Sequence, residues 1–156
     1  MQNGKTIFTY IDEGKIINKE LYRDWGMGTN KAGELVIGNY QTTQFKDFVS
    51  GYPFLIEAGK RSSINCGKEL DYNARRTAIG YNDKNVYVML VDNPGLRYNK
   101  MQDIFLSLGV DYAINLDGGG STRCLHNGKR ITALTSNRPV DNLVAFYLRP
   151  RVLYRV

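Results

Sequence analysis

Three consecutive glycines, Gly118–Gly120, follow the mostly apolar run Ala113–Leu116 and the carboxylate of Asp117. Glycine destabilises the interior of helices and strands, because it loses more backbone freedom on folding than any other residue. The glycines therefore predict that a buried strand over Asp111–Leu116 ends here in a loop. Such a loop lets a ligand approach the backbone, and its successive N–H groups can bind an anion.

Asp117 is placed by this pattern at the end of a rigid element, as a general acid or base requires. Ser121 and Thr122 add two hydroxyl groups directly after the glycines. The simpler alternative is a plain turn in which Asp117 accepts a hydrogen bond from its own backbone. We favour the functional interpretation, because a turn needs only one or two glycines. The loop is not a nucleotide-binding P-loop, because no lysine follows Gly120.

Short β-rich runs separated by turn residues account for most of the remaining chain. Two of these runs flank Asn82–Lys84 and two flank Asn127-Gly128, and both arrangements predict a β-hairpin. The expected strands cover Thr6–Ile11, Trp25–Thr29, Glu34–Gly38, Pro53–Glu57, Arg76–Tyr81, Asn85–Val91, Asp111–Leu116 and Leu143–Leu148.

Apolar spacing predicts two helices. Residues Asn99–Leu108 carry apolar side chains at i, i+3, i+4 and i+7, with Asn99 as the cap and Gly109 as the stop. Thr43–Val49 carry a shorter version of the same spacing. If the strands before and after the Asn99–Leu108 helix are parallel, the connection between them should be right-handed. We expect a single α+β domain over residues 1–156, with one or two helices packed on a mixed β-sheet and a Gly-rich loop at a strand end.

Composition limits the possible partners. The 156 residues are the length of one domain, and the longest apolar run, Val86–Val91, is far too short to span a membrane. No apolar segment follows Met1–Lys5 as in a secretory signal, so we expect a cytoplasmic protein. With 21 basic and 15 acidic residues the net charge is +6, which favours an anionic partner unless the charges only solvate the surface.

Neither a metal nor another cofactor is expected. The chain has Cys66, Cys124 and one histidine, His126, whereas structural zinc needs four such ligands. A catalytic pair of Cys124 and His126 lacks an obvious third group to orient it. A Cys66–Cys124 disulfide has no support in the sequence, and we expect two thiols in a reducing cytoplasm. Asp117 could contact a divalent cation, but one carboxylate is too few for a dedicated site.

The segment Asn115–Thr122, with the sequence Asn-Leu-Asp-Gly-Gly-Gly-Ser-Thr, resembles the signature of the phosphodiester glycosidase family. Further segments resemble other motifs of that family in the same order along the chain: Gly51–Lys60, Arg76–Gly80, Leu108-Gly109, Asn127-Gly128 and Arg138–Asn142. Together they extend from about Gly51 to Leu148. Domains of this family usually open with an Asn-Gly-Gly-Phe type strand, which this sequence lacks, so the resemblance is to a minimal or N-terminally shortened member.

The resemblance implies a hydrolase that cleaves the glycosidic bond of a sugar linked through its anomeric carbon to a phosphodiester. Asp117 would polarise water or stabilise charge at the anomeric carbon, and the Arg76 guanidinium would bind the phosphate. Substrate-binding residues would be Asn115, Gly118, Gly119, Gly120, Ser121, Thr122 and Arg138. Because Arg75 and Arg76 point to opposite faces of a strand, only one can face the site, and the resemblance selects Arg76. The second carboxylate that glycosidases usually have stays open among Glu57, Asp92 and Asp141.

Two alternative functions remain. A non-catalytic module on the same scaffold would sequester a phosphorylated sugar or a nucleotide. Nucleic-acid binding would also use the charge of +6, but no helix-turn-helix, zinc-finger or RNP-type motif supports it. The small size and the Lys-, Asn- and Tyr-rich composition would suit a phage or bacterial protein.

Overall fold

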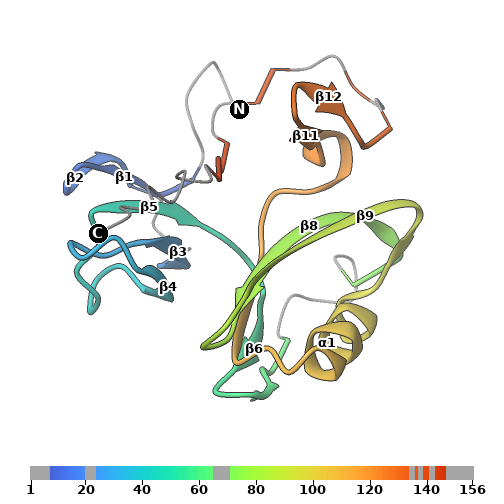
Figure 1. The fold of residues 1–156 in the computed structure, drawn as a ribbon, viewed down its shortest axis with the longest axis horizontal. Helices are drawn as coiled ribbons and strands as arrows, with labels where there is room; N and C mark the ends of the chain where they lie inside the picture. Colours follow the sequence, from blue (N-terminus) through green and yellow to red (C-terminus); the bar gives the residue numbers. More distant parts are fainter. Residues whose placement is uncertain are drawn as a thin grey trace, which may run out of the picture.

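The structure is a computed structural model that describes residues 8–19, 24–64, 71–133, 136, 139–140 and 143–146. These residues form two five-stranded sheets, a two-stranded hairpin, an α-helix and a short 3₁₀ turn (Figure 1). The α+β class is therefore confirmed. The expected single mixed sheet is wrong, because the strands divide between two sheets and every described strand pair is antiparallel. No helix of the described part is long and apolar enough to cross a membrane.

The first sheet has the order β2-β1-β5-β3-β4. Its strands are β1 (Tyr10–Asp12), β2 (Lys15–Asn18), β3 (Trp25–Thr29), β4 (Leu35–Asn39) and β5 (Asp47–Ser50). In the turn between β1 and β2, Glu13 and Gly14 both have positive φ. The predictions of β3 and β4 are confirmed to within one residue.

The predicted helix over Thr43–Val49 is wrong, because its second half is the strand β5. β5 pairs with β1 on one side and with β3 on the other, so tertiary pairing satisfies its backbone. Phe45 and Phe48 still pack together, with ring centroids 4.7 Å apart. Their i, i+3 spacing fits a helix equally well, and so short an apolar pattern does not separate the two.

The second sheet has the order β7-β6-β10-β8-β9. Its strands are β6 (Phe54–Glu57), β7 (Lys60–Arg61), β8 (Ala74–Tyr81), β9 (Val86–Leu96) and β10 (Tyr112–Asn115). The β8–β9 hairpin is confirmed. Since β9 and β10 both pair antiparallel with β8, which lies between them, they run in the same direction and are joined by α1 (Tyr98–Ser107).

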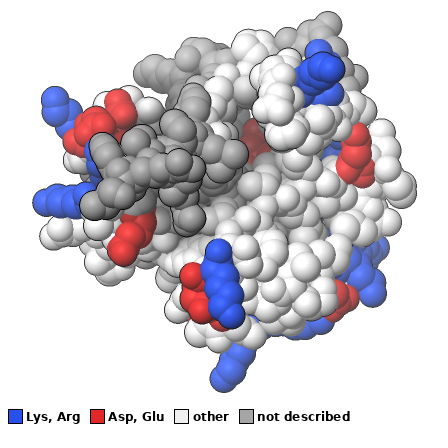
Figure 2. Space-filling view, viewed as in Figure 1, with Lys and Arg blue, Asp and Glu red and all other residues white. Residues whose placement is uncertain are grey.

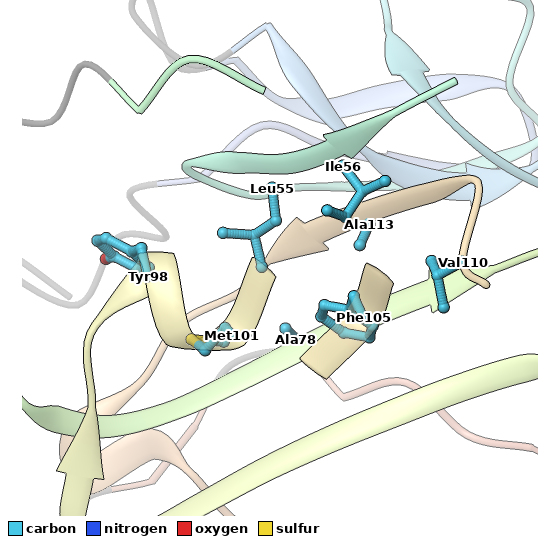
Figure 3. Close-up of a cluster of buried hydrophobic side chains, with 8 residues drawn as sticks. All are labelled: Leu55, Ile56, Ala78, Tyr98, Met101, Phe105, Val110 and Ala113. Atoms are coloured by element: carbon cyan, nitrogen blue, oxygen red, sulfur yellow. The ribbon is translucent and has the colours of Figure 1, made fainter. Parts of the chain in front are cut away.

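The second sheet is the middle of three layers. On one face, the α1 residues Met101 and Phe105 pack fully buried against Leu55, Ala78 and Ala113 (Figure 3). On the other face, Met27 and Ile37 of the first sheet pack against Ile79 and Ile114. Each buried Leu, Ile, Met or Phe side chain contributes about 1.5–3 kcal/mol relative to the same side chain exposed to water. Figure 1 shows the first sheet and α1 on opposite sides of this middle layer.

The ends of α1 differ partly from expectation. Gly109, at φ +66°, follows the helix and confirms the predicted stop. The predicted Asn99 cap is wrong, because Arg97 is the N-cap residue and makes no side-chain capping bond. Instead the Asp71 carboxylate accepts a hydrogen bond from the Tyr98 N–H at 3.3 Å.

The second predicted hairpin consists of β11 (Leu125–His126) and β12 (Lys129–Arg130). Its turn residues Asn127 and Gly128 both have positive φ, as the Asn-Gly signal predicts. The expected last strand is not formed in its described part, Leu143–Phe146. Its remaining residues lie outside the part of the chain that the structure describes.

Candidate functional site

The glycine loop starts where β10 ends beside β8. The N–H of Leu116 donates to the carbonyl of Thr77 at 2.7 Å, which fixes the exit from the strand. After Asp117 and Gly118 the chain forms a 3₁₀ turn over Gly119–Ser121.

A different structural constraint favours glycine at each of the three loop positions. A Cβ at Gly118 would lie 2.8 Å from the carbonyl oxygen of Arg75, so only glycine lets the loop contact the β8 backbone. Gly119 has φ +58°, a conformation that other residues adopt at a cost. A Cβ at Gly120 would lie 2.9 Å from the Cβ of Ser136. The three glycines therefore allow the loop to pack closely.

Asp117 makes the contact expected of a turn residue and also borders a cavity. Its Oδ1 accepts a hydrogen bond from the N–H of Gly118 at 2.9 Å. The residue is exposed and lines a cavity of about 1190 Å³. The role of Asp117 as a turn residue and its proposed role as a functional carboxylate are therefore compatible. One carboxylate oxygen binds the loop backbone, and the same residue borders the cavity.

This main cavity lies over the part of the second sheet that the first sheet leaves uncovered. Its floor includes Thr77 and Ile79 of β8 and Val88 and Leu90 of β9. Its walls are formed by the end of β5, the loop with Asp117 and Ser121, the β11–β12 hairpin, and residues 139–140 and 143–146. In Figure 1 the hairpin stands on the opposite side of β8 and β9 from α1.

Two arginines that were not predicted as site residues line the main cavity together with Asp117. They are Arg123, directly after Thr122, and Arg130 of β12. Arg123 also donates from Nη2 to the carbonyl of Ser136 at 2.5 Å. Arg123 could have been found by extending the hydroxyl motif by one residue. Among the described lining residues Asp117 is the one carboxylate, so cationic groups outnumber it.

Arg76 is not among the residues that line the main cavity. Its Nη1 donates to the Tyr98 hydroxyl at 2.6 Å, and its guanidinium lies 4.0 Å from the centre of the Tyr98 ring. Its Nη2 donates to the carbonyl of Tyr72 at 2.9 Å. Arg75 and Arg76 do point to opposite faces, but the face that carries Arg76 is the one that α1 covers.

Arg75 points instead toward the glycine loop. Its side chain is 6% exposed, and its Nε forms an ion pair with Asp92 Oδ1 at 2.8 Å. Its Nη2 donates to the carbonyls of Thr122 at 3.1 Å and of Ala133 at 2.8 Å. Asp92 Oδ2 in turn accepts from the N–H of Ala133 at 2.9 Å. Arg75 and Asp92 therefore tie β8 and β9 to the loop and to the segment after β12.

The same contacts explain the lowered pKa of the Asp92 carboxyl. The N–H of Ala133, and after it the N–H of Asn93 and the Arg75 guanidinium, lower the pKa of the Asp92 carboxyl below its ordinary value. Since Asp92 stays ionised and paired, it is not free to protonate a leaving group, although the sequence left it open as the second carboxylate.

Two predicted substrate-binding side chains are engaged within the protein. Thr122 is buried, and its hydroxyl lies 3.3 Å from that of Thr77. The Asn115 Nδ2 donates to the carbonyls of Tyr52 and Leu116, both at 2.7 Å. Neither residue lines the main cavity, whereas Ser121 does. Substrate contacts of the glycine-loop backbone stay predictions.

The remaining candidates lie elsewhere. Glu57 is exposed at the end of β6 and borders a separate, smaller pocket. Arg138, Asp141 and Cys66 are outside the described residues. Cys124 carries a free thiol and lines the main cavity together with the exposed His126. Within the described ranges, no three or more His, Cys, Asp or Glu side chains gather as a metal site would require.

The charged side chains on the face seen in Figure 2 are dispersed. On the face seen in Figure 2, Lys and Arg side chains alternate with Asp and Glu side chains over the described residues. A continuous basic surface, which nucleic-acid binding would use, is not visible on this face.

The glycine loop thus lies at the end of a sheet strand, beside a cavity lined by one carboxylate and two arginines. The model of the phosphodiester glycosidase family matches residues 2–147, and the chain belongs to this family. No match was found among curated proteins.

Solved structures share the fold. The catalytic domain of zebrafish N-acetylglucosamine-1-phosphodiester alpha-N-acetylglucosaminidase, auto-inhibited by its pro-peptide, superposes with a TM-score of 0.65 and 23% identity. The match covers 81% of this chain and 50% of that chain. A hypothetical protein from Synechocystis matches with a TM-score of 0.51 and 18% identity, over 80% of this chain and 30% of that one. The chain thus spans half or less of the length of these structures.

Proposed function

We propose that the chain hydrolyses the glycosidic bond of a sugar linked through its anomeric carbon to a phosphodiester. The observation that supports this activity is the main cavity, where Asp117 lies with the guanidinium groups of Arg123 and Arg130. Family membership supports the reaction type, and the arrangement of charges supports a substrate that carries a phosphate.

The proposed reaction assigns separate tasks to the acidic and basic groups. Water attacks the anomeric carbon, the bond from that carbon to the phosphate oxygen breaks, and the phosphomonoester leaves with the bonding electrons. Asp117 takes the proton of the attacking water or stabilises the positive charge at the anomeric carbon. Arg123 and Arg130 neutralise the phosphate, which needs charge compensation more than protonation when it leaves.

Arg75 and Asp92 act in this proposal as positioning residues. Arg75 donates to the carbonyl of Thr122, and Asp92 pairs with Arg75 and accepts from the N–H of Ala133, so together they hold the segment after Gly118–Gly120 against β8. Arg76 has no part in the proposed reaction, because Tyr98 and Tyr72 hold it on the α1 side of the sheet.

A binding module for a phosphorylated sugar is the second candidate function. One specific observation favours it: Asp117 is the one carboxylate among the described residues of the cavity lining, whereas glycosidases usually use two. Such a module would use the same arginines and would leave the diester intact.

Hydrolysis assays separate the two candidates. Methyl phosphodiesters of several sugar 1-phosphates are incubated with the protein, and released sugar is measured. Glycosidase activity should fall about 10²–10⁴-fold in Asp117→Asn, while the exposed-turn variant Asp83→Asn keeps the wild-type rate. Saturable binding of a diester without release of sugar would support the binding module. Activity that survives in Asp117→Asn would assign the chemistry to another residue.

A further inference from the structure

A second, smaller pocket lies where the two sheets meet, between Trp25 of β3 and residues of and near β6. Ser50 lines the main cavity, whereas Tyr52 lines the smaller pocket. The smaller pocket has a volume of about 250 Å³, and we call it the aromatic pocket. The residues that define it are Trp25, Tyr52, Pro53, Phe54, Glu57, Ser62 and Ser63.

Two large aromatic side chains stay accessible in this pocket. Trp25 of β3 stacks on Phe54 of β6 with ring centroids 5.1 Å apart and an interplanar angle of 29°. Trp25 nevertheless remains 41% exposed, and Tyr52 is 37% exposed. Aromatic rings present an apolar face together with a polar N–H or O–H, so they suit ligands that are apolar on one face and polar at their edges.

The polar groups of the pocket are acceptors and hydroxyls. Glu57 brings an exposed carboxylate, and Ser62 and Ser63 bring hydroxyls that both donate and accept. No Lys or Arg is among its described lining residues, in contrast to the main cavity with Arg123 and Arg130. The aromatic pocket therefore suits a neutral ligand rich in hydroxyl groups and not a phosphate.

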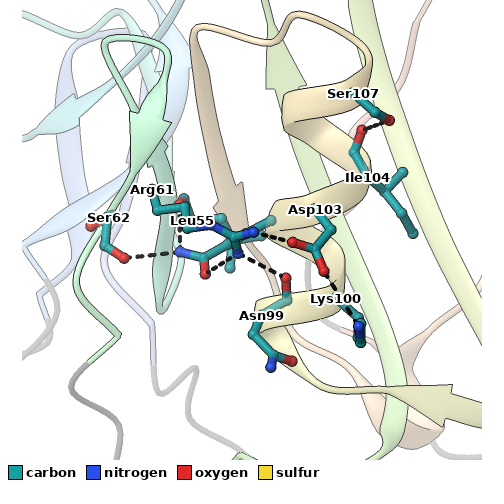
Figure 4. A network of polar contacts seen from close by, with 9 residues as sticks. Leu55, Arg61, Ser62, Asn99, Lys100, Asp103, Ile104 and Ser107 are labelled. Atoms are coloured by element: carbon teal, nitrogen blue, oxygen red, sulfur yellow. Dashed lines mark hydrogen bonds and ion pairs between the residues drawn. The ribbon is translucent and has the colours of Figure 1, made fainter.

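Backbone contacts from several elements hold the walls of the pocket in place. The carbonyl of Trp25 accepts from the N–H of Gly51 at 2.9 Å, and the carbonyl of Tyr52 accepts from Asn115. The buried side chain of Gln102 donates to the carbonyls of Ser62 and Leu55, each at 2.9 Å (Figure 4). A pre-formed site of this kind requires little ordering when a ligand binds.

We propose that the aromatic pocket binds one neutral pyranose unit of a glycan, with the sugar ring against Trp25 and Tyr52 and its hydroxyls on Glu57 and the serines. Its volume is below the roughly 300–1,000 Å³ of pockets for drug-sized ligands, which limits the occupant to about one sugar ring. This binding does not depend on hydrolysis in the main cavity.

The chain itself provides the reporter for a test. Trp25 is its single tryptophan, so tryptophan fluorescence reports directly on this pocket. The full chain is titrated with the methyl glycosides of N-acetylglucosamine, mannose, glucose and galactose. We expect a saturable fluorescence change with at least one of them, with a dissociation constant of about 1 mM, as is reasonable for so small a ligand.

Variants assign the signal to the pocket. Tyr52→Ala and Glu57→Gln should each weaken binding about tenfold or more, whereas Asp83→Asn, an exposed carboxylate on the β8–β9 turn, should leave it unchanged. Asp117→Asn should also leave it unchanged, so a failed hydrolysis assay and a failed sugar titration are separate results. Melting curves of all variants verify that they are folded.

Three results would overturn the proposal. These are the absence of a saturable change with every glycoside, an equal response in Tyr52→Ala and Asp83→Asn, and a response to tetramethylammonium in place of the sugars. The last result would indicate a cation site built from the same aromatic rings and Glu57.

Discussion

Individual residues of the loop show why the glycine signal is ambiguous from sequence. Gly118 is required by the β8 backbone beside it, and Gly119 by its positive φ. Both requirements are structural, and both bring Asp117 to the edge of the main cavity. The sequence predicts that the loop exists and that Asp117 borders it. It could not predict the close contact with Arg75, because that contact depends on the distance between two strands far apart in the chain.

Substitution of these two glycines should have unequal effects. In Gly119→Ala the new Cβ meets no atom within 4 Å, so the cost is the left-handed backbone, about 1–2 kcal/mol. In Gly118→Ala the Cβ lies 2.8 Å from the Arg75 carbonyl and the β8 backbone must shift, which adds about 1–3 kcal/mol to any backbone cost. Urea denaturation of both variants measures the difference. A Gly118→Ala protein with the midpoint of the unsubstituted chain would mean that the loop does not pack against β8 as described.

The two neighbouring arginines show what alternation can and cannot predict. Period-2 alternation correctly separates Arg75 from Arg76, but it does not say which face of β8 carries the loop. The answer depends on where α1 packs, and Tyr98 of α1 binds Arg76.

Arg75→Met should destabilise the fold, whereas Arg130→Met should not. Removing the Arg75 guanidinium leaves the carbonyls of Thr122 and Ala133 without this donor, at a cost of about 1–3 kcal/mol in the free energy of unfolding. Arg130 is exposed, and its loss should change stability by less than about 0.5 kcal/mol. Denaturation curves of the two variants provide the test. A stable Arg75→Met protein would show that the contacts to Asp92 and to the loop are not needed to hold it.

At the scale of elements, local signals predict the hairpins and the long helix, while non-local pairing decides the rest. Asn127-Gly128 and Asn82–Lys84 specify their turns without help from the remaining chain. Residues 43–49 carry an equally plausible local pattern for a helix. Asp47–Ser50 nevertheless form a central strand, because they pair with β1 on one side and with β3 on the other. Gly26 and Gly28 of β3 make this possible, since a Cβ at either would lie less than 3 Å from the β5 backbone.

Two adjacent residues of α1 test how this element is held. Phe105 is fully buried against the second sheet, and Ile104 is 40% exposed. Phe105→Ala should lower the free energy of unfolding by about 3–5 kcal/mol, because it leaves a cavity under the helix. Ile104→Ala removes mostly exposed surface and should cost less than about 1 kcal/mol. Thermal and urea unfolding of both variants measures the contrast, and similar losses would mean that α1 presents a different face to the sheet.

At the scale of the whole molecule, the junctions between layers produce two cavities of different chemistry. The first sheet covers only part of the second, which leaves the main cavity beside β8 and β9 and the aromatic pocket beside β3 and β6. Arginines line the first and aromatic rings with a carboxylate line the second. The diester site proposed in the main cavity would therefore use only a local part of the net charge of +6, the basic side chains of Arg123 and Arg130.

This local action predicts a specific pattern of charge effects on diester binding. Arg130→Met and Lys84→Met each lower the net charge by one, but only Arg130 lines the main cavity, whereas Lys84 is exposed on the β8–β9 turn. In an Asp117→Asn background, which suppresses turnover, calorimetry with a methyl phosphodiester of N-acetylglucosamine 1-phosphate should show at least about tenfold weaker binding for Arg130→Met. Lys84→Met should differ little, because salt at about 0.1 M screens charges more than about 10 Å apart. If both substitutions weaken binding equally, the diester responds to the overall charge of the protein and the main cavity is not its site.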